Sequence, residues 1–148
     1  PVTVRRRVGT HLWLGGADAY RYTSSVTDVH QVSRGERVGY WQRAVPDPRG
    51  GQVVVVDGGT SHGVAMSAPT PGASVRQQLT AAAGGLLNAS RLALSPFSIG
   101  GRKRFFVEPP HMQASLVWVP GGVNVTVGAE IDVTMRATTA TPDAIVLE

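Results

Sequence analysis

Alternation of apolar and polar residues along the chain predicts a mainly β protein. In AEIDVTMRA the apolar residues Ile131, Val133 and Met135 alternate with polar ones, which is the pattern of a strand with one buried face. The run from Val53 to Val56 predicts a strand buried on both faces. This strand is expected to end abruptly at the Asp-Gly-Gly sequence that begins at Asp57.

Other strands are predicted from their boundaries. FFVEPP and HMQASLVWV are expected to form two strands with a sharp corner near His111, because proline cannot donate to a central ladder. SSVTDVHQVSRGERVGYW favours two strands around a turn at Ser33 to Gly35, although the valine spacing of its first half also suits a helix. LSPFSIGG (94–101) and MSAPTPGA (66–73) are predicted to be loops.

One segment has helical rather than alternating spacing. In SVRQQLTAAAGGLLNAS, apolar residues from Val75 to Leu86 recur on one helical face, and Ser74 and Asn88 stand where caps are expected. We therefore predict one short helix at about 74–88, weakened by two glycines. The whole pattern predicts a β-barrel or sandwich of about eight strands with this one helix, forming a single β-domain over residues 1–148.

Composition fits one globular domain. The chain has 148 residues, 42% of them hydrophobic and 16% charged, which is enough to build one core. No apolar run reaches the length of a membrane span and no signal peptide is recognisable. Cysteine is absent, which fits a reducing compartment, so a cytoplasmic protein with no membrane partner is expected. The opening residue Pro1 suggests a piece of a longer protein.

The net charge of +4 comes from thirteen arginines and a single lysine against ten acids. Two clusters, 5–7 and 102–104, lie beside apolar sequence, and we interpret them as solvated strand ends or an interface rim. A free-standing basic β-domain that binds nucleic acid or another protein through residues 102–106 stays as an alternative, with nucleic acid the less favoured partner.

Few residues have the spacing of known catalytic or metal motifs. Lys103 stands between two arginines, so a surface role is favoured over covalent amine catalysis. The four histidines lack the spacing of a local metal motif, and no metal site is expected. DGGTSHG contains Asp57, Ser61 and His62, but a hydrolase triad is assembled in space and the G-x-S-x-G elbow is absent.

Several short motifs, in order, resemble those of the carboxy-terminal β-domain of the alanine racemases. VVVVDGGTSHG is similar to their G-Y-A-D-G region, and FFVEPPHMQASLVWV to their V-C-M-D-Q region, although the acid of the Met-Asp-Gln element is lost. RRVGTHLWLG, SSVTDVHQVSRGERVGYW and VTVGAEIDVTM are similar to the end of the racemase barrel, the first strand pair and a late strand. The resemblance implies a pyridoxal phosphate enzyme whose cofactor is bound by a preceding barrel domain, with no cofactor ligand in this chain.

The resemblance also implies site residues. Thr60 stands where the racemases have a catalytic tyrosine that one subunit presents to the active site of the other. A threonine hydroxyl exchanges protons poorly near neutral pH, so His62 is the second catalytic candidate, because histidine changes charge in that range. Substrate-binding residues implied around this loop are Ser61, His111, Met112 and Tyr40.

The predicted function is therefore that of the carboxy-terminal domain of a pyridoxal phosphate-dependent amino-acid racemase. Such a domain would pack on the barrel of its own chain, complete the active site of a homodimer partner for an amino-acid substrate, and be inactive alone. VVVVDGG is also similar to a strand of the diaminopimelate and ornithine decarboxylases, so a decarboxylase domain is the alternative. A non-catalytic dimerisation scaffold is the third hypothesis.

Overall fold

The computed structural model describes residues 19–44, 49–65 and 93–147 of the chain. In this part there are eight strands and one turn of 3₁₀ helix. They are β1 (Tyr22–Val32), β2 (Arg37–Val38), β3 (Arg43–Ala44), β4 (Gly51–Asp57), η1 (Thr60–His62), β5 (Leu94–Ile99), β6 (Arg102–Phe106), β7 (Ala114–Pro120) and β8 (Glu130–Val133).

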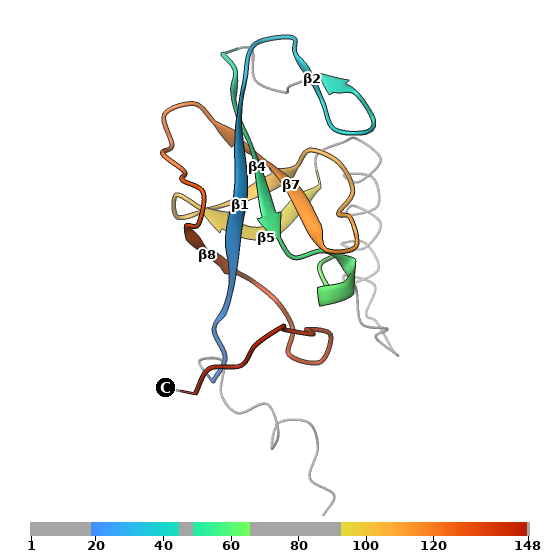
Figure 1. Ribbon diagram of the computed structural model, residues 1–148, viewed down its shortest axis with the longest axis vertical. Helices are drawn as coiled ribbons and strands as arrows, with labels where there is room; N and C mark the ends of the chain where they lie inside the picture. Colours follow the sequence, from blue (N-terminus) through green and yellow to red (C-terminus); the bar gives the residue numbers. More distant parts are fainter. Residues whose placement is uncertain (1–18, 45–48, 66–92, 148) are drawn as a thin grey trace, which may run out of the picture.

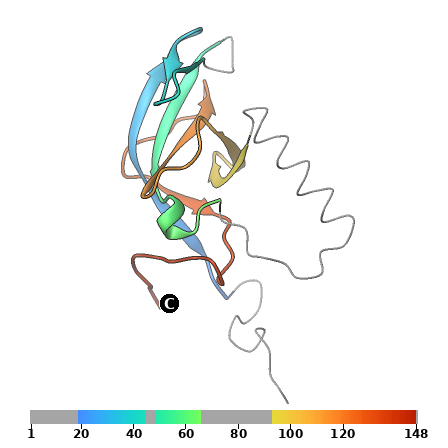
Figure 2. The ribbon, with the colours of Figure 1, turned by 90° about the vertical axis from the view of Figure 1, so that its right-hand side faces the viewer.

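Six of these strands close into a barrel in the order β1-β4-β7-β6-β5-β8. Every neighbouring pair is antiparallel, including the pair β1 and β8 that closes the ring. Closure pairs each strand on both sides, so no strand of the barrel presents an unpaired edge. The remaining strands, β2 and β3, form a small two-stranded hairpin beyond one end of β1 and β4 (Figures 1 and 2). The prediction of a mainly β chain that forms a barrel is confirmed.

The valine run of β4 is buried on both faces, as its sequence predicts. Val54 and Val56 point into the barrel core, where they pack with the inward residues of the other strands. Val53 lies on the opposite face in a smaller cluster with Val32 and Trp118, against which Val38 of β2 packs. The β2–β3 hairpin covers this part of the outer barrel surface through Val38. Valines on both faces of β4 are therefore removed from water.

The segment 94–101 was expected to be a loop, and this prediction is wrong, since Leu94–Ile99 is strand β5. Alternate residues Ser95, Phe97 and Ile99 are buried. Pro96 is tolerated because the pairing with β6 is irregular between Leu94 and Ser98, so its missing N–H breaks no regular ladder. Its carbonyl still accepts a hydrogen bond from the Thr134 N–H at 2.9 Å.

The other predicted strands are present, although their bounds differ. The second strand expected in the 24–41 segment is the two-residue β2, which pairs with β3 and not with β1. The strand expected at FFVEPP is β6, which begins at Arg102 and ends at Phe106. β1 is a strand and not a helix, and it ends in a turn where the Glu36 N–H donates to the Ser33 carbonyl at 3.2 Å. Pro109 and Pro110 fall between β6 and β7. The strand in 129–137 is shorter than predicted, because pairing ends at Val133. The helix predicted at 74–88 and the loop at 66–73 lie outside the described residues.

None of the helical structure in the described ranges has the length and apolar character needed to cross a bilayer.

Phe97 should be a central determinant of stability. Its side chain is 0% exposed and its ring meets that of Phe106 edge to face, with centroids 6.4 Å apart. Phe97→Ala is expected to lower the free energy of unfolding by about 3–5 kcal/mol, because the cavity it leaves cannot collapse fully. Phe105→Ala is the matched control, since Phe105 is 41% exposed, and it should cost less than about 1 kcal/mol. Urea unfolding of the two variants measures the difference, and equal losses would contradict this account of the core.

Candidate functional site

Two loops meet at one end of the barrel because β4 and β7 are paired. Their register places Asp57, the last residue of β4, opposite Ala114, the first residue of β7. The chain that leaves β4 therefore runs beside the chain that enters β7. We call these segments the first loop (58–64), which contains η1, and the second loop (107–113), which connects β6 to β7.

Backbone hydrogen bonds join the two loops. The N–H groups of Thr60 and Ser61 donate to the carbonyls of His111 and Met112 at 2.8 and 2.9 Å. The Ser61 hydroxyl donates to the same Met112 carbonyl at 2.5 Å. The structure thus brings together four of the six predicted site residues, two from each loop. Ser61 and Met112, for example, are 51 positions apart in the sequence.

Gly59 makes this close approach possible. A Cβ atom at this position would lie 2.1 Å from the His111 carbonyl oxygen and 2.6 Å from that of Met112. Its φ of −141° is an extended conformation open to any residue, so the requirement for glycine is one of space. Without a side chain at Gly59 the two loops can hydrogen-bond directly.

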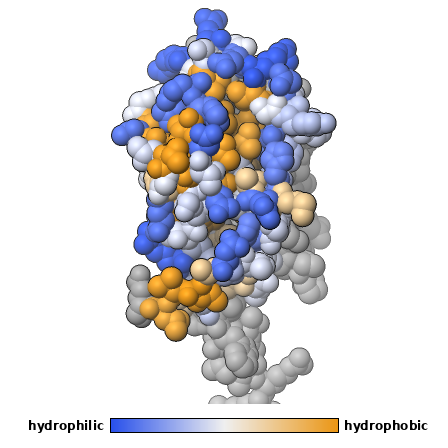
Figure 3. All heavy atoms as spheres, in the orientation of Figure 1, coloured by the Kyte–Doolittle hydropathy of each residue, from blue (hydrophilic) through white to orange (hydrophobic). Residues whose placement is uncertain are grey.

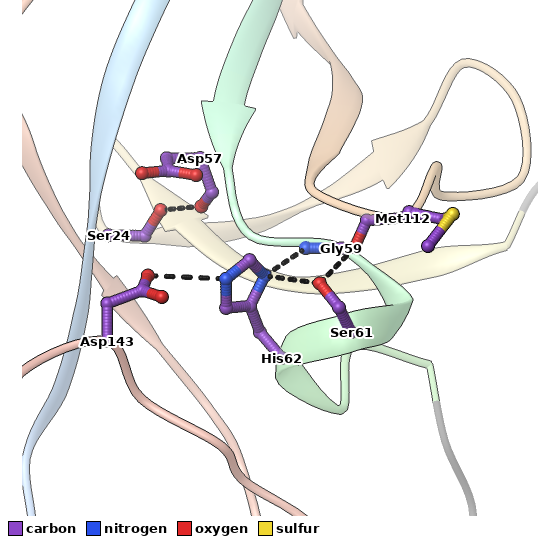
Figure 4. A network of polar contacts seen from close by, with 7 residues as sticks. All are labelled: Ser24, Asp57, Gly59, Ser61, His62, Met112 and Asp143. Atoms are coloured by element: carbon purple, nitrogen blue, oxygen red, sulfur yellow. Dashed lines mark hydrogen bonds and ion pairs between the residues drawn. The ribbon is translucent and has the colours of Figure 1, made fainter.

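His62 is held on both sides of its ring. Its Nδ1 accepts a hydrogen bond from the Gly59 N–H at 3.1 Å, and its Nε2 lies 3.2 Å from the Oδ2 atom of Asp143 (Figure 4). An Nδ1 that accepts carries no proton, so in the neutral ring the proton is on Nε2 and faces the carboxylate. The side chain is 17% exposed. His62 therefore fastens the first loop to the carboxy-terminal segment.

The carboxy-terminal segment also contacts the first loop through its backbone. The Thr141 N–H donates to the His62 carbonyl at 3.2 Å, and a Cβ atom at Gly63 would lie 2.0 Å from the Thr139 carbonyl oxygen. The first loop is consequently packed between the second loop on one side and residues 139–143 on the other.

Ser61, His62 and Asp143 are aligned in the order of a hydrolase triad (Figure 4), with Ser61 Oγ 3.3 Å from His62 Nδ1. The hydrogen bonds exclude that chemistry in this arrangement. The serine proton is directed to the Met112 carbonyl, and the single lone pair of Nδ1 already receives the Gly59 N–H, so the imidazole has no free site to accept the serine proton. Asp57, the acid next to this motif in the sequence, has no bond to His62, and its backbone carbonyl accepts the Ser24 hydroxyl.

Thr60 lies exposed on η1. No hydrogen bond of its hydroxyl is formed within the described part of the chain. Of the first-loop side chains, it is the one left open to a ligand or partner.

A buried acid connects the second loop to the β2–β3 hairpin. Glu108 is 2% exposed, and its Oε1 lies 2.7 Å from His111 Nε2. Its Oε2 accepts the Trp41 N–H at 3.4 Å, and a Cβ atom at Gly39 would overlap this carboxylate. Tyr40, the sixth predicted site residue, stands between these two contacts with its side chain exposed. Within the described residues Tyr40 itself makes no hydrogen bond to either loop, and its neighbours Gly39 and Trp41 connect the hairpin to Glu108.

Sequence reasoning missed Glu108 and Asp143. Glu108 had a usable signal, because a lone charge between Val107 and two prolines stands in an apolar context where burial requires a partner. Asp143 had none, since it lies in a segment without periodicity and far from His62 in the sequence.

The described residues do not fit covalent attachment of pyridoxal phosphate. That attachment needs a lysine whose charge is suppressed by burial or by its neighbours. Lys103, the single lysine of the chain, is exposed on β6 opposite Ser98, away from the two loops. The described ranges also hold no group of three or more His, Cys, Asp or Glu side chains placed to bind a metal ion.

Comparison with solved structures agrees with this architecture. An alanine racemase from Clostridium difficile 630, in a complex with cycloserine, matches 81% of this chain with 13% identity and a TM-score of 0.51. The chain has the fold of the alanine racemase carboxy-terminal domain. An alanine racemase from Oenococcus oeni matches 83% of it with 18% identity and a TM-score of 0.49. The first match, at 13% identity, shows a shared fold and no more.

The chain spans about a quarter of the length of these enzymes, 25% of the first and 28% of the second. No protein-family model and no curated protein sequence matches it.

His62 should stabilise the loops mainly by accepting the Gly59 N–H. His62→Ala leaves that buried donor without a partner, and we expect a loss of about 1–3 kcal/mol in the free energy of unfolding. His62→Asn should recover much of this loss, because the amide oxygen of asparagine can occupy the place of Nδ1. Asp143→Ala should cost only about 0.2–1 kcal/mol, as for other exposed ion pairs. Chemical unfolding of the three variants tests the order, and an alanine variant as stable as the asparagine variant would contradict it.

Gly59→Ala should disrupt the contact between the loops. The added methyl group overlaps two carbonyls that belong to the backbone and cannot rotate away, so the free energy of unfolding should fall by about 1–3 kcal/mol or more. Gly121→Ala is the control, because its nearest neighbour would be at an ordinary 3.9 Å. Amide hydrogen exchange at Thr60 and Ser61 reports the loss directly, and unchanged protection in Gly59→Ala would show that the loops accommodate the methyl group.

Proposed function

We propose that this chain is the carboxy-terminal domain of a pyridoxal phosphate-dependent amino-acid racemase and that it completes the active site of a second subunit. The observation that supports this most directly is the joining of the two loops. The loop that resembles the catalytic loop of the racemases (Thr60 to His62) is hydrogen-bonded to the segment that resembles their Met-Asp-Gln element (His111 and Met112). Both motifs thus lie at the same end of a barrel with the racemase domain fold.

The proposed roles follow from the contacts. Thr60 offers an exposed hydroxyl that can donate to or accept from a substrate, but its high pKa makes it unsuited to proton exchange near neutral pH. His62 has both ring nitrogens engaged, so to exchange a proton it must first leave Gly59 or Asp143. We therefore propose that His62 holds Thr60 and Ser61 in place at the entrance.

Exposed apolar side chains support a role beside another domain or subunit. Near the two loops these are Tyr40, Trp41 and Met112, which are 89%, 63% and 73% exposed. A further apolar patch lies over the carboxy-terminal segment (Figure 3), where Ile145, Val146 and Leu147 are exposed. Clustered exposed apolar surface is typical of an interface. We propose that a barrel domain of the same protein and a homodimer partner cover these surfaces.

In this proposal the chain belongs to a longer, cytoplasmic protein, whose barrel domain supplies the lysine and the phosphate contacts of the cofactor. Pyridoxal phosphate withdraws electrons from the substrate Cα, and the residues described above position and enclose the amino acid. A decarboxylase of the same two-domain plan would use the same surfaces, so the reaction has to be distinguished by its product.

The alternative of a basic β-domain that binds nucleic acid or another protein through residues 102–106 receives less support. Arg104 donates from Nε to the Ile99 carbonyl at 2.7 Å, and burial, followed by the neighbouring charge of Arg102, lowers its pKa. One of the three cations of the 102–104 cluster is therefore committed to the β5–β6 hairpin rather than presented to a phosphate backbone.

The proposal predicts the behaviour of the intact protein with its upstream segment. With pyridoxal phosphate it should show the visible absorbance band of a lysine Schiff base, and chiral chromatography should show interconversion of L- and D-amino acids. The 148-residue chain alone should show neither, because Lys103 is exposed. A band accompanied by carbon dioxide release, without interconversion, identifies the decarboxylase instead. Absence of the band from the intact protein contradicts both assignments.

A further inference from the structure

The carboxylate of Glu108 is shared between two parts of the fold. Its Oε1 lies 2.7 Å from Nε2 of His111 in the second loop. Its Oε2 accepts the N–H of Trp41, in the turn of the β2–β3 hairpin, at 3.4 Å. The Glu108 side chain is 2% exposed, and a buried carboxylate that loses a partner is costly. The contact with the second loop and the contact with the hairpin therefore depend on each other.

The β2–β3 hairpin is the less firmly held of these two parts. Each of its strands has two residues, joined by two residue pairs, and a hairpin of this size is marginally stable by itself. Val38 attaches it to the barrel, because this partly buried side chain packs against the outer cluster. Gln42 in the turn has a φ of 49°, a left-handed conformation that is costly for a residue other than glycine. The hairpin therefore relies on its contacts with the rest of the domain.

Gly39 allows the turn of the hairpin to approach the carboxylate. A Cβ atom at Gly39 would lie 2.5 Å from Glu108 Oε2. Gly35, in the turn before β2, has nearly the same φ, +77° against +74°, but a Cβ atom there would have no atom within 4 Å. The two glycines thus share a backbone conformation and differ in their distance from Glu108.

The second loop carries this connection to the first loop. The Thr60 N–H donates to the His111 carbonyl at 2.8 Å, and the Ser61 N–H donates to the Met112 carbonyl at 2.9 Å. The residue whose ring contacts Glu108 therefore also holds Thr60 through its backbone. A continuous series of contacts leads from the hairpin to the first loop.

We propose that the β2–β3 hairpin is a movable element whose docking on Glu108 strengthens the bonds between the two loops. The docked hairpin keeps water from the carboxylate, so Glu108 holds the His111 ring more strongly. When the hairpin leaves, water reaches the carboxylate and the ring is held less firmly. The loop bonds at Thr60 and Ser61 then open more often. This coupling is a property of the chain itself and is independent of the proposed reaction.

The coupling gives the surface of the hairpin an influence on a distant part of the domain. Tyr40 and Trp41, in its turn, are 89% and 63% exposed, and the hairpin lies at the opposite end of β4 from η1 (Figure 1). Coupling between two sites is reciprocal in free energy. A contact that holds the hairpin in its docked position therefore tightens the first loop without touching it.

The first test measures amide hydrogen exchange at Thr60 and Ser61 in the 148-residue chain. Gly39→Ala places a methyl group against Glu108 and should displace the hairpin, so exchange at both amides should rise on the order of 5-fold or more. Gly35→Ala is the matched control, because it introduces a similar backbone strain without the overlap. It should leave both rates close to those of the wild type. The amides of β4 report global opening and should exchange equally in both variants. Equal rates at Thr60 and Ser61 in the two variants overturn the proposal.

The second test removes the shared carboxylate. In a Glu108→Ala background the overlap with residue 39 and the contact with His111 are both lost, so Gly39→Ala and Gly35→Ala should give the same rates at Thr60 and Ser61. A difference that persists in this background shows that the hairpin acts on the loops by another route, which overturns the role of Glu108.

The third test starts from the loop and does not require Glu108→Ala to fold. His111→Ala should raise exchange of the Gln42 N–H, which donates to the Gly39 carbonyl at 3.2 Å, by a factor similar to that of the first test, because coupling is reciprocal. His30→Ala is the control, since the ring of His30 contacts the exposed Asp28 on β1. An unchanged Gln42 rate in His111→Ala contradicts the coupling.

Discussion

The antiparallel pairing of β4 with β7 is the constraint on which the rest of the structure depends. It runs without interruption from Gly51 opposite Pro120 to Asp57 opposite Ala114. Both strands contribute to the core, and β4 is buried on its outer face as well. Because a one-residue slip in register would exchange the residues that face the barrel core with those that face outward, the strand ends are held at fixed positions. The loops that follow these strand ends therefore also begin at fixed positions.

Close backbone contact then determines how the loops can be used. Gly59 leaves no room for a side chain, so the backbone N–H groups of the first loop reach the carbonyls of the second directly. This closeness buries the Gly59 N–H, and the ring of His62 satisfies it. His62, which the sequence marks as a catalytic candidate, therefore stabilises the backbone of the first loop. The same contacts leave the side chains of Thr60 and His111 exposed.

Charge burial distinguishes the two histidines of the site. Asp143 is exposed, so water screens its attraction for His62, whereas Glu108 is enclosed and its contact with the half-exposed His111 is screened less. Glu108 also joins the hairpin that carries Tyr40 to the loop that carries His111. One buried acid therefore links the outer hairpin to the candidate site.

Much of the fold could be predicted from the sequence, because local pattern determines which residues can form strands. The valine run, the alternation around Ile131 and the proline break at Pro109 each predicted an element that the structure contains. The exception was β5, where Pro96 concealed an alternating pattern that irregular pairing makes acceptable.

For the site, the sequence by itself determined which reactive side chains the two loops carry. Only the tertiary structure decided which of them are free, since the partners of His62 and His111 are set by hydrogen bonds and burial. Asp143 reaches His62 across the fold, and the Glu108 carboxylate takes up its role because the barrel and the hairpin exclude water around it. Such contacts depend on how the strands pack in three dimensions, and a local sequence pattern does not contain this information.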